Sequence, residues 1–205
     1  SMIYCRFIEA RHLTSMGIRK KKAGIHYLQG LLVGFAMISL AALTSTLFGA
    51  TEMSLCKSPN MAIIALMAVG FLIQGMSEEF IFRGYLMNSI GGKNNPWLAL
   101  IVSSAAFSLA HLLNPGFNLF VFFNLTLFGV FAGLYMIAFD DIWGASAIHS
   151  IWNFTQGCFY GISVSGTGDT ESIFRTVQVS QNSFLTGGNF GVEGSIFTTI
   201  TLIIA

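Results

Sequence analysis

The chain has 205 residues, of which 54% are hydrophobic and only 9% are charged. A soluble domain would carry about 25% charged residues, so this composition excludes an ordinary soluble globular protein and indicates a polytopic membrane protein. The formal net charge of +1 gives no reason to expect nucleic acid as a partner, and the three scattered cysteines show no metal-binding spacing.

The amino-terminal 22 residues are polar and basic, and they end in the run Lys20, Lys21 and Lys22. Basic residues beside a membrane span are retained on the cytoplasmic side. We therefore predict that this end of the first span faces the cytoplasm. The pattern of a cleavable signal peptide is absent.

Six apolar segments follow and predict an all-α membrane helix bundle with five full spans and part of a sixth. In chain order they lie at about residues 25–50, 61–90, 97–113, 117–139, 142–161 and 194–205. The last is too short to cross the roughly 30 Å hydrocarbon core by itself. A polar loop at 163–194 precedes it. Because the chain shows neither an internal repeat nor a shift in composition, we expect one membrane-embedded domain over 1–205.

Pairs of glycines four residues apart recur in the predicted spans. They are Gly30 with Gly34, Gly129 with Gly133, and Gly157 with Gly161. Small residues at this spacing allow two membrane helices to approach closely, so these segments are predicted to lie at helix–helix contacts.

A cluster of charged residues, Glu78, Glu79 and Arg83, follows an uncharged run from 61 to 76. Charged residues within a membrane segment usually face the bundle interior and mark function. On a helix, Glu79 and Arg83 stand four residues apart and can pair, whereas Glu78 is turned away by about 100°. Glu78 is thus left for partners on other helices. The alternative is a charge cluster in water beside the membrane.

Two histidines and an amide supply those partners in the later spans. His149 and Asn153 are four residues apart and share one helical face. Phe107 precedes His111 by four residues and offers its ring a packing surface. At about 1.5 Å per residue from the predicted cytoplasmic ends, Glu78 lies at roughly 18 Å, His111 at roughly 21 Å and His149 at roughly 12 Å. All three are expected in one layer of the membrane.

The conjunction of these groups favours a catalytic site. Taken singly, a histidine in an apolar helix is more often a packing residue, and Asn153 can simply bond across helices. Together, a carboxylate, two imidazoles and an amide can hold a water, take its proton and stabilise an oxyanion.

The three motifs Glu78-Glu79-x-x-x-Arg83, Phe107-x-x-x-His111 and His149-x-x-x-Asn153 resemble those of the CPBP family, also called Abi. That family groups CAAX prenyl proteases with bacteriocin-processing and immunity proteins. The likeness runs from about residues 13–17 to about 187–194, and it is of the bacterial type. Family members usually have more membrane helices, so we expect one or two to be missing at the amino end.

The resemblance implies an all-helical intramembrane endopeptidase in a bacterial plasma membrane. Carried over to this chain, Glu78 would activate the attacking water with His111 helping to position it, while His149 and Asn153 would polarise the scissile carbonyl and stabilise its oxyanion. Arg83 would hold Glu79, and Phe107 would support His111. The expected partner is a peptide or membrane-protein substrate, for which a prenylated CAAX tail, a leader peptide and a membrane-protein loop all stay open.

The sequence leaves open whether the site uses a metal ion. Glu78, His111 and His149 are a legitimate zinc set with an open position for water, but the soluble pattern of two histidines on one helix is absent. We expect no cofactor, with zinc as the alternative. Two other classes also stay open. One is a non-catalytic immunity protein or peptide-binding scaffold, and the other is a small transporter, which would more often show repeats and broken helices.

Overall fold

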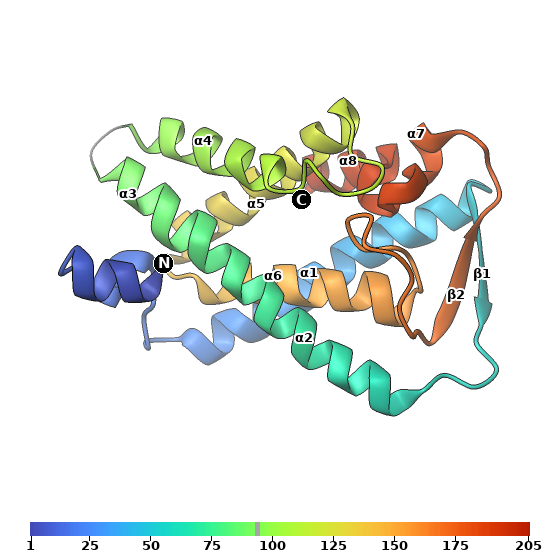
Figure 1. Cartoon of the computed structure of the whole chain (residues 1–205), viewed down its shortest axis with the longest axis horizontal. Helices are drawn as coiled ribbons and strands as arrows, with labels where there is room; N and C mark the ends of the chain where they lie inside the picture. Colours follow the sequence, from blue (N-terminus) through green and yellow to red (C-terminus); the bar gives the residue numbers. More distant parts are fainter. Residues whose placement is uncertain (93–94) are drawn as a thin grey trace.

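The computed structural model describes residues 1–92 and 95–205. It is a bundle of helices with a small sheet at one end (Figure 1). The principal helices are α1 (Ala23–Leu47), α2 (Met61–Glu79), α4 (Pro96–Leu109), α5 (Leu119–Phe139), α6 (Trp143–Phe154) and α8 (Ile196–Ile204). A mostly helical, apolar bundle confirms the predicted fold class.

The helix that carries the charged cluster is the longest in the described chain. It begins at Met61, after Asn60, whose side-chain oxygen accepts from the backbone nitrogens of Ala62 and Ile63, as expected for an N-cap. It continues from α2 through the π-helical η3 (Phe80–Met87) and α3 (Asn88–Gly91). The predicted extension to about residue 90 is therefore confirmed. The change from α to π winding falls directly after Glu79, and such bulges are frequent at functional sites.

The third predicted span is shorter than expected, because α4 ends at Leu109 and not near residue 113. His111 therefore lies in turns just beyond the helix, where its backbone nitrogen donates to the carbonyl oxygen of Ser108. The chain must reverse here into α5. Pro115 disfavours a helical residue before it, and Gly116 has a φ of +83° in a place where a Cβ would lie 2.7 Å from the backbone nitrogen of Phe190.

Three segments of the described chain are long and apolar enough to cross a membrane: Ala23–Leu47, Met61–Gly91 and Leu119–Phe139. The apolar helix α4 is shorter. The chain is thus an integral membrane protein, while the number of five full spans and a partial sixth stays a prediction.

Helix α6 lies between α1 and α2 (Figure 1), and almost every residue along it is buried. The glycine pair of α1 allows this packing. A Cβ at Gly30 would lie 2.3 Å from the carbonyl oxygen of Gly144, and one at Gly34 would lie 2.6 Å from Cγ2 of Ile151. On α2, a Cβ at Gly75 would lie 2.7 Å from the backbone nitrogen of Ser150. Close glycine contacts therefore hold α6 from both sides.

A two-stranded antiparallel sheet was not predicted. Strand β1 (Thr51–Leu55) pairs with β2 (Phe174–Gln178), with Thr51 opposite Gln178. Strand β1 falls between the first two predicted spans, and β2 falls in the polar stretch predicted as a loop. The pairing was missed because each strand is only five residues long and its partner is more than a hundred residues away. The second stretch also contains the short helices α7 (Ser183–Thr186), η5 (Gly188–Phe190) and η6 (Val192–Gly194).

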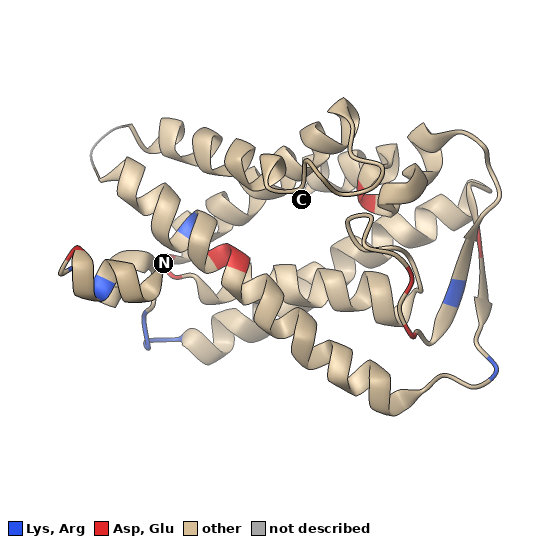
Figure 2. Cartoon of the chain, viewed as in Figure 1, with Lys and Arg blue, Asp and Glu red and all other residues tan. Residues whose placement is uncertain are grey.

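Charged residues are scarce along most of the helical bundle (Figure 2). They gather in the amino-terminal segment and around the sheet and its loops. The long helices carry charge mainly where α2 meets η3, at Glu78, Glu79 and Arg83. This junction lies midway along the bundle and is where the candidate site is built.

Candidate active site

The structure brings together three side chains from three parts of the chain. Oε2 of Glu78, on α2, lies 3.9 Å from Nε2 of His111 and 3.9 Å from Nε2 of His149 on α6. Neither distance is a direct hydrogen bond. One water at about 2.8 Å from each partner can bridge such gaps.

Glu79 is fully buried and fixes one of these histidines. Its Oε1 accepts a hydrogen bond from Nη1 of Arg83 at 3.0 Å and another from Nδ1 of His149 at 2.8 Å. The pairing with Arg83 was predicted, and the contact with His149 was missed. A carboxylate only accepts, so Nδ1 of His149 carries the proton. The bond turns Nε2 of that ring toward Glu78.

The backbone of Phe107 orients His111 in the same sense. Its Nδ1 donates to the carbonyl oxygen of Phe107 at 2.9 Å, which leaves Nε2 facing Glu78. The Phe107 ring lies 5.0 Å from the His111 ring and 5.6 Å from the His149 ring, centroid to centroid. The guanidinium carbon of Arg83 lies 4.3 Å from the same ring centroid. Phe107 therefore contacts both imidazoles and the cation.

Glu78 keeps one oxygen free for a ligand. Its Oε1 accepts from Nε2 of Gln74, whereas its Oε2 is buried and has no hydrogen-bond partner among the described residues. Buried polar atoms are nearly always satisfied by protein or ordered water. The side chain as a whole remains 24% exposed. The unpaired oxygen thus marks a place for a water or substrate atom beside both Nε2 atoms.

Asn153 lies one turn beyond His149 on α6 and is buried. Its Nδ2 donates to Oε1 of Gln74 at 2.8 Å. Gln74 therefore contacts both Glu78 and Asn153. Sequence reasoning did not single it out, although its position four residues before Glu78 places it on the same helical face.

The residue types around Glu78, a carboxylate and two imidazoles, suit zinc. Among the described residues, no three His, Cys, Asp or Glu side chains are grouped as ligands of one ion. Zinc would need donor atoms about 2.0–2.2 Å from the ion. We therefore assign no chemical step to a metal here.

A buried carboxylate outside the three motifs secures the loop beside His111. Oε2 of Glu193 accepts from the backbone nitrogen of Ser165 at 2.7 Å, from Oγ of Ser165 at 3.0 Å and from Nε2 of Gln156 at 3.2 Å. Burial raises the pKa of Glu193, while the bonds from Ser165 and the charge of His111 oppose the shift. The Ser165 carbonyl in turn accepts from Nδ2 of Asn114 at 2.8 Å. This network was not predicted.

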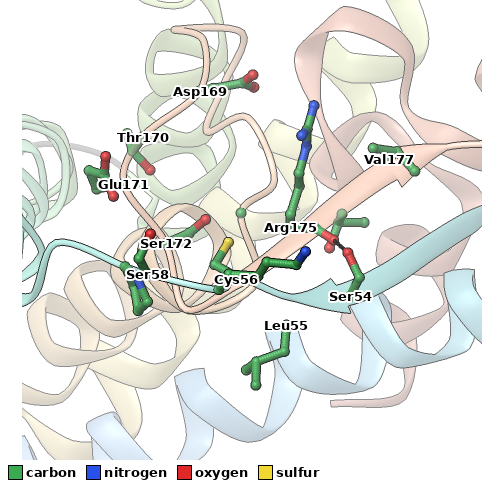
Figure 3. Close-up of a pocket in the computed structure, with 14 residues that line it drawn as sticks. Ser54, Leu55, Cys56, Ser58, Asp169, Thr170, Glu171, Ser172, Arg175 and Val177 are labelled. Atoms are coloured by element: carbon green, nitrogen blue, oxygen red, sulfur yellow. Dashed lines mark hydrogen bonds between the residues drawn. The ribbon is translucent and has the colours of Figure 1, made fainter.

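A cavity of about 570 Å³ lies elsewhere in the molecule (Figure 3). Polar and charged side chains from β1, β2 and the loop at 169–172 surround it. None of the predicted catalytic residues lines it. The candidate active site is therefore the cluster at Glu78 and not this cavity.

Comparison with known protein families gives a match to part of the chain. The family described as Rce1-like, type II CAAX prenyl endopeptidase Rce1-like, matches residues 59–155. This segment contains all three motifs, from Glu78 to Asn153. No curated protein and no solved structure matches the chain.

Proposed function

We propose that the chain is a member of the Rce1-like family of type II CAAX prenyl endopeptidases, whose family model matches residues 59–155, and that it cleaves its peptide substrate with a water activated by Glu78. The family supports an intramembrane endopeptidase in general. The observation that carries the finer proposal is the unpaired Oε2 of Glu78, which lies 3.9 Å from Nε2 of both His111 and His149.

The first step is attack by water. A water held between Oε2 of Glu78 and Nε2 of His111 is within reach of a carboxylate base, and general-base catalysis of this kind contributes about 10²–10⁴-fold. Glu78 takes one proton from the water while the oxygen of the water bonds to the scissile carbonyl carbon. His111 aligns the water, because its ring is fixed through Nδ1 on the Phe107 carbonyl.

The second requirement is stabilisation of the oxyanion. A proton on Nε2 of His149 would donate to it, and Glu79, bound to the other nitrogen of that ring, stabilises the resulting cation. Asn153 has two N–H donors, of which one is bound to Gln74, and the other can reach the same oxygen. Removing one such donor typically costs about 10²–10³-fold in rate.

The reaction closes when the tetrahedral intermediate collapses. The C–N bond breaks, and the proton held by Glu78 passes to the leaving amine. Glu78 returns to its ionised form, so atoms and charge balance without a cofactor. We propose this metal-free route, and zinc held by Glu78, His111 and His149 is the alternative that chelation tests.

The substrate class and the cellular location are also part of the proposal. We propose that the substrate is a peptide or a membrane-protein segment, with a prenylated CAAX tail as one candidate class, and that no nucleic acid takes part. The basic run of Lys20, Lys21 and Lys22 supports a cytoplasmic location for that end of α1, in a bacterial plasma membrane.

The test is cleavage by the purified protein in detergent. Three labelled peptides, a prenylated CAAX tail, a leader peptide and a membrane-protein loop, are incubated with wild type and with Glu78→Gln, and products are identified by mass spectrometry. We expect wild type to cut at least one peptide at a single bond and Glu78→Gln to cut none. Equal binding without cleavage by both proteins would instead support a peptide-binding scaffold.

A further inference from the structure

Gln74 is a polar side chain inside the apolar run of α2, one turn before Glu78. It forms two hydrogen bonds, donating from Nε2 to Oε1 of Glu78 and accepting at Oε1 from Nδ2 of Asn153. The plainer interpretation is that Gln74 only ties α2 to α6, as amides do between membrane helices. The direction of its bonds supports a more specific role.

The two hydrogen bonds of Gln74 form a relay between Glu78 and Asn153. The donor and acceptor groups of the three side chains determine the direction of this relay. An ionised carboxylate only accepts hydrogen bonds, so the nitrogen of the Gln74 amide must face Glu78. The Gln74 oxygen must then face Asn153, and an oxygen only accepts. The Asn153 amide therefore turns its nitrogen, and not its oxygen, toward Gln74. Glu78 thus sets the direction of an amide on another helix.

Two consequences bear on the reaction. First, Gln74 occupies Oε1 of Glu78, so that Oε2 is the oxygen left facing His111 and His149. Second, Gln74 uses one of the two N–H groups on Asn153 and leaves the other available for the proposed oxyanion. A reversed Asn153 amide would present an acceptor oxygen and would repel an oxyanion.

We propose that Gln74 is a positioning residue, which holds the proposed base Glu78 and the proposed oxyanion donor Asn153 in their reactive orientations. This rests on the proposed function. Gln74 acts through both residues and not on the substrate. Supporting partners of metal-ligating side chains are typically worth about 10–100-fold in affinity or activity, and we expect an effect of similar size for Gln74.

The first test is the substitution Gln74→Met, which keeps the length of the side chain and removes both hydrogen bonds. We expect kcat to fall about 10–100-fold while KM changes by less than about 3-fold, because the substrate contacts remain. Gln29→Met is the matched control, since Gln29 is exposed on α1, and it should leave both constants unchanged. Wild-type kcat in Gln74→Met would overturn the proposal.

A double-mutant cycle separates positioning from a general effect on folding. If Gln74 acts partly through Asn153, Gln74→Met should cost several-fold less in an Asn153→Leu background than in the wild-type protein. Equal costs in both backgrounds, with a matching drop in the thermal unfolding temperature, would indicate only a structural tie. Should Gln74→Met not fold, Gln74→Leu replaces it, because leucine suits an apolar helix and also removes both hydrogen bonds.

The final measurement does not depend on cleavage. Nuclear magnetic resonance of side-chain amides in detergent follows Asn153 directly, with its signals assigned by their loss in Asn153→Leu. Gln74→Met should move these signals, and Gln29→Met should not. If wild type cuts no peptide, the proposed function fails while this result still decides the role of Gln74. Unmoved Asn153 signals would overturn the positioning role.

Discussion

Glu79 holds His149 through a 2.8 Å hydrogen bond that joins residues 70 positions apart in the chain. The same oxygen of Glu79 also accepts from Arg83. Of two adjacent carboxylates, Glu79 therefore orients the imidazole from its Nδ1 side, while Glu78 faces the Nε2 side. This geometry divides a structural role from a chemical one, and the two roles can be separated by mutation.

The first prediction concerns Glu78. Glu78→Gln keeps the size and hydrogen bonding of the side chain but removes its basicity, so cleavage should fall by about 10²–10⁴-fold. The thermal unfolding temperature should stay near that of wild type, because Oε2 has no hydrogen-bond partner among the described residues to lose. Peptide cleavage and thermal unfolding measured on the same preparation check both parts. Full activity in this variant would refute the assigned base.

The second prediction concerns Glu79. Glu79→Gln leaves Arg83 buried without its ionic partner and weakens the bond to His149. Removing one partner of a buried pair costs about 3–5 kcal/mol, so the protein should lose both stability and activity. Glu52→Gln, at an exposed position on β1, is the matched control. A thermally silent Glu79→Gln would show that the division of roles is wrong.

The third prediction concerns metal. Activity should survive EDTA and phenanthroline, because a water bound by hydrogen bonds loses nothing to a chelator. A catalytic zinc would instead be lost together with turnover. Elemental analysis of the purified protein accompanies the assay. About one zinc per chain, with activity lost to chelator and restored by zinc, would overturn the metal-free mechanism.

The fourth prediction concerns the contact between α1 and α6. A Cβ at Gly30 would lie 2.3 Å from the backbone oxygen of Gly144, so Gly30→Ala must push the two helices apart. Overpacking of this kind costs about 1–3 kcal/mol. Gly24→Ala is the control, because its Cβ would meet no atom within 4 Å. The thermal unfolding temperature should drop for Gly30→Ala and not for Gly24→Ala. Equal unfolding temperatures for the two variants would contradict the packing described.

The fifth prediction concerns Glu193. Its pKa is raised in the folded protein above the ordinary value of 4.5, chiefly by burial. The folded state therefore binds the proton more tightly than the unfolded state, and stability falls as pH rises from the unfolded pKa through the folded one. Glu193→Gln removes this dependence, so its stability relative to wild type should increase with pH over that range. Thermal unfolding across pH measures the difference, and a constant difference would contradict it.

Much of the architecture could be predicted because it depends on local sequence. The lack of charge required a membrane, the long apolar runs required helices, and the spacing of Glu79 and Arg83 put them on one face. The expectation that Glu78, His111 and His149 lie at one depth followed from the rise per residue. These properties depend on hydropathy and helical period, which each segment carries by itself.

What the tertiary structure alone decided is how segments distant in sequence meet. The bond from Glu79 to His149, the relay through Gln74 to Asn153 and the pairing of β1 with β2 each join parts of the chain more than 60 residues apart. Their geometry depends on the rotation of α6 against α2, which the contact of Gly75 with Ser150 permits. A helical period gives the face on which a residue lies, but only packing determines which atom of that residue faces a neighbour.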